Sequence, residues 1–328
     1  MTAQTTGAPA NTRESFEFKL FAQKYSTLVV LALVIIVFSF MSNRFLGTGN
    51  LLNILQQISM LTIVAVGLTF GFSVREMDLS VGFTAALGGL IVPLCLLKGY
   101  SLSVALACGL AGGLLVGLCN VVLIVVIGVP SLIATIAVGE ILFGINFVMT
   151  DGRAIYGAFP DSYLELGQGQ LFGIPTPAVI MIGIVGLSWV VLQRTVFGRH
   201  LYAVGGNPRA AELAGINVRF YRSAGLLISS VFATVAGIVL SARLGSGQPA
   251  AGDSYLLDGL AAVFLGMTML RPGTSTILGT FYGALLIGVM NNGLNLLGMD
   301  SYFQSIIKGV IIVLAVAVVS RTTKIKLT

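Results

Sequence analysis

The chain carries very little charge for its length. Only 9% of its 328 residues are Asp, Glu, Lys or Arg, whereas soluble globular domains have about 25%. So few charged side chains cannot cover a water-facing surface, and 56% of the residues are hydrophobic. The composition therefore excludes an ordinary soluble domain. It predicts an all-α, polytopic transmembrane helical bundle whose main solvent is the bilayer.

Residues that build reactive sites are also scarce. The only histidine is His200, and the cysteines, Cys95, Cys108 and Cys119, lie in apolar stretches without metal-ligand spacing. The cysteines are therefore interpreted as small packing residues. The sequence has no Walker A pattern, no Cys/His cluster and no Gly-x-Ser-x-Gly elbow. These absences favour transport over a membrane-embedded enzyme and predict that this chain binds no cofactor. If ATP powers transport, the ATPase is another chain.

Long apolar runs are frequent and predict a membrane domain at 25–320 with about ten spans, because crossing the hydrocarbon core takes about 20 apolar residues. The run at 25–42 lacks a small-residue cleavage site and is expected to remain as an anchor helix. The predicted spans are residues 25–42, 51–72, 79–97, 101–127, 131–150, 176–193, 223–242, 256–270, 275–296 and 302–320.

The net charge of +6 reflects orientation in the membrane, because the basic residues lie in short segments between apolar runs. There is no basic stripe with interleaved aromatics, so nucleic acid is not an expected partner. With the segment 1–24 in the cytoplasm, alternation of the spans also places the tail 321–328 there. Few basic residues then lie outside: Arg44, Lys98, Arg153 and Arg243.

Two connections are long enough to have a function: the outside loop 151–175 and the inside loop 194–222. In the inside loop, Asn207 suits a helix N-cap, Pro208 suits the first helical position, and Gly215 suits the end of the helix. This short helix would present a small apolar face for docking to a cytoplasmic partner. A merely solvated loop is an equally good interpretation, since so short a helix is marginal without a partner.

Residues 198–216 resemble the Gly-Arg-x-x-x-Ala-x-Gly-Gly-Asn-x-x-Ala-Ala-x-x-x-Gly-Ile signature of ribose-type ABC importer permeases, a family that serves ribose and related monosaccharides. The similarity extends over nearly the whole chain. Further matching stretches are Asn53-Ile-Leu-Gln-Gln57, Asp78-Leu-Ser-Val-Gly82, Ala242-Arg243 with Gln248-Pro249, Leu257-Asp258, and residues 291–298.

The resemblance implies a multi-pass protein of the bacterial inner membrane, embedded in lipid, with a second permease copy as its partner in a homodimer or heterodimer. It also implies cytoplasmic ATPase subunits that bind ATP and Mg²⁺, and a periplasmic protein that delivers the sugar. The inside loop would then contain the helix that couples to the ATPase. Its candidate residues are Gly205, Gly206, Asn207, Pro208, Arg209, Ala210, Ala211, Glu212, Leu213 and Gly215.

Two turns depart from the family pattern. Before the Asp-Leu-Ser-Val-Gly stretch, where the family has a turn rich in Ser and Gly, this chain has Val74-Arg75-Glu76-Met77. Between the eighth and ninth predicted spans, the family has a glycine-rich turn, and this chain has residues 266–273 with Arg271 and Pro272.

Several polar residues fall within or beside the predicted spans, where they are costly and usually face protein or water. Asp78 and Asp258 are each interpreted as lying at a helix start. Glu140 could line a path, pair with Lys308 or be protonated, and Lys308 could instead reach the outer interface. The amides are expected to join helices or line the path. The full set is Asp78, Asn120, Glu140, Asp258, Asn291, Asn292, Asn295 and Lys308.

One alternative function remains open. The chain could be a secondary transporter that couples sugar to protons or sodium, with Glu140 and Asp258 as the coupling carboxylates. An ATP-driven system and an ion-driven system differ in energy source, so transport under an ion gradient alone distinguishes them.

Overall fold

The computed structural model describes residues 27–269, 273–300, 302–310 and 313. The predicted segments 1–24 and 321–328, the residues Arg271 and Pro272, and most of the second half of the last predicted span lie outside the described residues. The described helices are Thr27–Met41, α2 (Thr48–Ser73), α3 (Val81–Leu97), α4 (Leu102–Val121), α5 (Ser131–Thr150), α6 (Asp161–Gln168), α7 (Thr176–Arg194), α8 (Val196–Gly206), α9 (Pro208–Leu213), α10 (Val218–Leu244), α11 (Asp253–Met267) and α12 (Ile277–Leu296), with a π-helical stretch over Val122–Ile127 and helical residues at 302–310.

The all-α, polytopic bundle predicted from composition is confirmed. Each predicted span coincides with a described helix to within a few residues, except the last, which is described only in part. Among the described residues, six helices are long and apolar enough to cross a membrane, and Thr27–Met41 and α3 are shorter apolar helices. The count of ten spans and the cytoplasmic side of both termini stay predictions.

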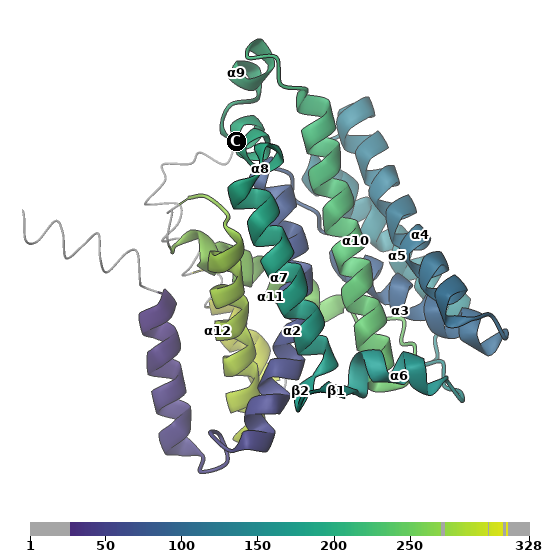
Figure 1. Cartoon of the computed structure of the whole chain (residues 1–328), viewed down its shortest axis with the longest axis vertical. Coiled ribbons are helices and arrows are strands. Elements are labelled where there is room, and N and C mark those ends of the chain that lie inside the picture. The colour runs from purple at the N-terminus through teal and green to yellow at the C-terminus, as the bar shows by residue number, and fades with distance from the viewer. Residues whose placement is uncertain (1–26, 270–272, 301, 311–312, 314–328) are drawn as a thin grey trace, which may run out of the picture.

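The two long connections lie at opposite ends of the bundle, where Figure 1 shows α8 and α9 at one end and α6, β1 and β2 at the other. The strands Gln170–Leu171 (β1) and Ile174–Pro175 (β2) form an antiparallel hairpin. The loop 194–222 is more helical than expected, since α8 fills its first half. Gly205 and Gly206 therefore end α8 and do not belong to the short helix, which corrects their assignment to the coupling helix.

Helices α2 and α10 form the centre of the bundle, and close packing there depends on small residues. Helix α10 packs against α2, α3 and α4. At Gly113 in α4, an added Cβ atom would lie 1.7 Å from Thr234 Oγ1, and at Gly237 in α10 it would lie 1.7 Å from Ala85 O. Such contacts exclude any larger residue, so the backbones of neighbouring helices approach closely, as in other membrane bundles.

Helices α3 and α11 begin inside the bundle, beside each other. After α10, residues 245–252 run back along α3, because Gly247 lies against Gly89 and Gly252 lies against Gly82. Helix α11 starts directly after this segment, at Asp253. Asp258 is therefore within the helix and not at its start. The predicted start at residue 256 is wrong, because the apolar run begins at Leu256 whereas the helix begins three residues earlier, at Asp253.

Helix α6, in the connection 151–175, is fixed to the bundle by a buried aromatic residue. The Tyr163 side chain is fully buried, and its hydroxyl lies 2.6 Å from Ser241 Oγ of α10. Burial raises the pKa of Tyr163 to about 12, although the hydrogen bond with Ser241 partly opposes this shift. This anchor was not predictable from the sequence, because loop 151–175 has no long periodic segment.

Candidate functional site

The short helix α9 has the local structure predicted for it. Asn207 is the N-cap, and its side-chain oxygen accepts a hydrogen bond from the Ala210 N–H at 3.1 Å. Pro208 is the first helical residue, where its missing N–H costs nothing. Gly215 follows the helix with a φ of +80°, a left-handed conformation that favours glycine.

One large apolar side chain, that of Leu213, is exposed on the outward side of α9. Leu213 is 87% exposed, whereas Ala211 is buried against the end of the bundle in a cluster with Val74 and Val204. The helix is thus seated by one side and presents a large apolar side chain on the other. Such an arrangement fits a groove on a partner better than it fits bulk water.

Helix α9 contacts both α8 and α10. An added Cβ at Gly205 would lie 2.1 Å from Ser73 O, so α8 is in backbone contact with the end of α2. The ring nitrogen Nδ1 of His200 in α8 lies 2.7 Å from the hydroxyl of Tyr221 in α10. These contacts make α8, α9 and the first turns of α10 one connected unit.

Asp78 lies in a buried polar cluster that joins α3, α4 and α10. Its Oδ1 accepts from the backbone N–H of Ser80 at 3.1 Å and from the Ser80 hydroxyl at 2.6 Å. Asn120 Nδ2 donates to Ser80 Oγ at 3.0 Å, and Ser230 Oγ lies 3.5 Å from Asp78 Oδ2. Ser80, and not Asp78, is the N-cap of α3. The predicted contact of the carboxylate with a backbone N–H near the helix start is nevertheless present.

Asp258 forms the second buried cluster, with a cation as its partner. Lys308 Nζ lies 3.0 Å from Asp258 Oδ2, and Asn291 Nδ2 donates to the same oxygen at 3.2 Å. The side chains of Asp258 and Lys308 are only 8% and 19% exposed. Lys308 therefore does not pair with Glu140. It turns to Asp258 because an unpaired carboxylate inside the bundle would be costly.

The remaining amides join helices, as one of the two interpretations predicted. Asn292 in α12 and Asn50 in α2 exchange two hydrogen bonds, at 2.9 and 3.0 Å. Asn295 accepts a hydrogen bond from Gln304 Nε2 at 2.7 Å. Sequence reasoning missed Asn50 and Gln304, since an isolated polar residue near a helix end has no distinctive pattern.

Glu140 lies apart from both clusters. It is at the middle of α5 and is exposed on the outside of the single chain. In the described part of the chain, it has no hydrogen bond or ion pair. A carboxylate at this depth is costly if it faces lipid.

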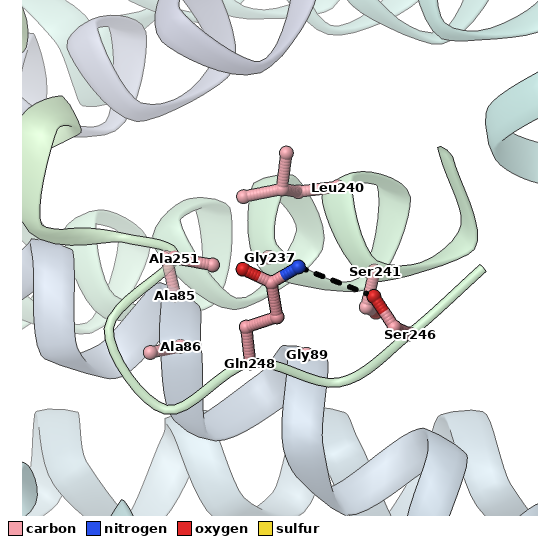
Figure 2. A pocket seen from close by; sticks show the side chains of 9 residues that line it. All are labelled: Ala85, Ala86, Gly89, Gly237, Leu240, Ser241, Ser246, Gln248 and Ala251. Atoms are coloured by element: carbon pink, nitrogen blue, oxygen red, sulfur yellow. Dashed lines mark hydrogen bonds between the residues drawn. The ribbon is translucent and has the colours of Figure 1, made fainter. Parts of the chain in front are cut away.

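A small cavity lies where α3, α10 and the loop after α10 meet (Figure 2). Figure 2 shows Gln248 in its centre, with Nε2 donating to Ser246 Oγ at 3.3 Å. The cavity volume is about 10 Å³, enough for one water molecule. It is too small for a sugar. Elsewhere among the described residues, no group of three or more His, Cys, Asp or Glu side chains could hold a metal ion.

The chain matches a known family of membrane proteins along most of its length. The family model described as "Branched-chain amino acid transport system / permease component" matches residues 50–316. The chain belongs to this permease family. The match includes every described helix from α3 to α12 and both buried carboxylate clusters.

Curated relatives of this permease are similar over nearly their full length. The ribose import permease protein of Haemophilus influenzae is 37% identical over 93% of this chain and 96% of its own. That of Escherichia coli K12 is 41% identical, covering 92% and 94%, and that of Bacillus subtilis is 38% identical, covering 90% and 92%. The resemblance to ribose-type permeases is thus confirmed. No solved structure matches the chain.

The residues described above lie in two kinds of place in the chain. The clusters around Asp78 and Asp258 are internal and join helices, which is the usual role of polar groups in membrane bundles. Helix α9 and Glu140 are exposed on the surface of the single chain, where another chain or a substrate can reach them.

Proposed function

We propose that this permease is the membrane subunit of an ATP-binding-cassette importer for a monosaccharide, located in the bacterial inner membrane. One observation carries the proposal: ribose import permeases from three bacteria are 37–41% identical over at least 90% of both chains. A pentose such as ribose is the first substrate to test, followed by hexoses and related polyols.

Helix α9 is the contact with the ATPase. It lies at the end of the bundle opposite the β1–β2 hairpin, in the connection that the positive-inside rule assigns to the cytoplasm. Its exposed Leu213 is the apolar anchor. ATP and Mg²⁺ bind to the ATPase chains, and closure of those chains moves the connected unit of α8, α9 and the start of α10.

The opposite end of the bundle receives the periplasmic sugar-binding protein. Helix α6 and the β1–β2 hairpin lie at this end, and Tyr163 fixes α6 to α10. A fixed surface suits docking of a separate protein, because little conformational freedom is lost on binding.

The sugar path lies between this chain and a second copy. Glu140 in α5 is exposed at mid-span and would be costly against lipid. Placing α5 along a path between two copies gives Glu140 a polar surrounding. Its carboxyl group could then accept hydrogen bonds from sugar hydroxyls.

An ion-coupled secondary transporter is less well supported. Its mechanism needs carboxylates that bind and release the coupling ion, and Asp258 is already neutralised by Lys308 at 3.0 Å. Proteoliposomes that contain the permease without the ATPase should show no sugar uptake under a proton or sodium gradient. Uptake under those conditions would favour the ion-coupled mechanism.

The test of the ATPase contact is the double variant Asn207→Pro with Leu213→Asp. Proline cannot adopt the φ of −151° found at Asn207 and removes the capping oxygen. Aspartate places a charge where the apolar anchor was. We expect normal membrane insertion, loss of ATPase co-purification, and loss of ATP-dependent ribose uptake in proteoliposomes that contain the ATPase and the sugar-binding protein.

A matched control is Phe172→Asp, which also replaces a fully exposed apolar residue by a charge but lies in the hairpin at the other end. This variant should retain the ATPase. Normal ATP-dependent uptake in the α9 double variant would overturn the assignment of the ATPase contact.

A further inference from the structure

The turn between α2 and α3 forms a partly buried ion pair with α10. Glu76 Oε1 lies 2.5 Å from Nε of Arg222, which is in the second turn of α10. The Glu76 side chain is 8% exposed and that of Arg222 is 31% exposed. The neighbouring Arg75 is exposed. The two adjacent charges of this turn therefore differ in environment, and only Glu76 is turned into the protein.

The ion pair joins the α8–α10 unit to this turn at a place where packing alone already brings the two together. Gly225 of α10 lies against Val74, and Gly205 of α8 lies against Ser73. These contacts set the separation of the backbones. Van der Waals contacts have little directional preference, whereas a charged hydrogen bond fixes the direction of approach.

The same turn is bonded to α5 immediately after Glu76. The backbone N–H of Met77 donates to Ser131 Oγ at 3.4 Å, and that of Leu79 donates to Thr135 Oγ1 at 3.0 Å. Ser131 is the first residue of α5. Residues 74–80 thus form a bonded connection from the base of the α8–α10 unit to the start of α5, the helix that carries Glu140.

We propose that the Glu76–Arg222 ion pair is a positioning element that transmits movement of the ATPase-facing unit to α5, and so couples ATP hydrolysis to opening of the sugar path. The inference rests on the proposed function, because it takes α9 as the ATPase contact and α5 as a wall of the path. When α10 moves at its cytoplasmic end, Arg222 draws Glu76 with it, and the turn moves the start of α5.

An ion pair suits this role better than it suits plain stabilisation. Burying a charged pair is often no more favourable than burying apolar side chains of the same size. Removal of one partner, however, leaves the other charge without compensation. The pair therefore keeps the turn attached to α10 while both move, since separation of Glu76 from Arg222 is costly in each position.

The test compares Glu76→Ala and Arg222→Ala in proteoliposomes that contain the complete importer, with ribose uptake and ATP hydrolysis measured on the same sample. We expect both variants to retain the ATPase and to hydrolyse ATP within about twofold of the original rate. Sugar moved per ATP should fall about fivefold or more, a typical size for coupling between two sites. A purely structural role would lower the amount of folded protein without changing this ratio.

Two further variants keep the test decisive. Arg75→Ala removes the adjacent exposed charge and should leave the ratio unchanged. The charge reversal Glu76→Arg with Arg222→Glu should recover most of the lost ratio, because it restores the pair. An unchanged ratio in both single variants, or no recovery in the reversal, would overturn the inference.

The outcome also separates this inference from the proposed function. If the inference alone is wrong, the original protein still shows ATP-driven uptake and the α9 double variant still loses it. If the original protein shows no ATP-driven uptake with its ATPase, the proposed function fails, and the inference fails with it.

Discussion

Asp258 and Asp78 are both carboxylates inside a membrane bundle, but their surroundings balance them in different ways. Asp258 has a cation, Lys308, at 3.0 Å, and an amide from Asn291. Asp78 is surrounded by neutral donors, chiefly the backbone and hydroxyl of Ser80. Among the described residues, no Lys or Arg forms an ion pair with Asp78.

The two carboxylates also connect different helices, and they do so by different interactions. The ion pair between Asp258 and Lys308 joins residues 302–310 to α11, and both of its charges are largely buried. The Asp78 cluster joins the start of α3 to α4 and α10 through hydrogen bonds from uncharged donors to the carboxylate. A buried pair is sensitive to loss of either charge, whereas a carboxylate held by neutral donors can be replaced by an amide at lower cost.

The same substitution at the two positions should therefore give different results. Asp258→Asn leaves Lys308 as an uncompensated, largely buried cation, and we expect it to lower the free energy of unfolding by about 3 kcal/mol. Thermal unfolding of the purified protein in detergent measures this loss. A change no larger than that of Asp78→Asn would contradict the comparison.

The double variant Asp258→Asn with Lys308→Met removes both charges and sharpens the same point. It should be more stable than Asp258→Asn alone, because no charge is left unpaired and methionine fills a similar volume. If the double variant unfolds at the same temperature as the single variant, the loss does not come from the unpaired cation.

Asp78→Asn should have a smaller effect. The remaining amide oxygen can still accept from Ser80, so we expect a loss of about 1 kcal/mol, the size of one hydrogen bond. Thermal unfolding again provides the measurement. Asp78→Leu is the useful contrast, since it removes every acceptor and should cost clearly more.

Glu140→Gln should have the smallest effect of all. Glu140 has no described partner, and glutamine keeps its length and one acceptor oxygen. The rate of ribose uptake should therefore change by no more than about twofold, and the unfolding temperature should stay the same. Ribose uptake in proteoliposomes checks this. A large loss of uptake with normal stability would show that the path needs a negative charge at this position.

Much of the fold followed from sequence patterns because the constraints are local. A span needs a continuous apolar run, and among the described residues every predicted run except the last, which is described only in part, forms a helix close to the predicted bounds. The cap residues of α9 were also predictable, since Asn207, Pro208 and Gly215 act within a few residues of themselves. Helices α6 and α8 were missed because they are short and are stabilised mainly by contacts with other helices.

The pairing of polar residues did not follow from the sequence. Lys308 was expected beside Glu140 or at the interface, and it lies against Asp258, which is 50 residues away in the chain. Glu76 was noted only as a departure from a family pattern, and its partner is Arg222. Spacing along the chain does not reveal which faces of two helices meet.

The sequence by itself determined that this is a helical membrane protein, roughly where its long apolar helices run, and which permease family it belongs to, because hydrophobic length and local motifs are properties of contiguous residues. Only the tertiary structure decided which charges are paired, which are exposed, and that residues 74–80 connect α10 to α5. Those properties depend on how glycine-lined helices approach each other, and that approach brings together residues far apart in the chain.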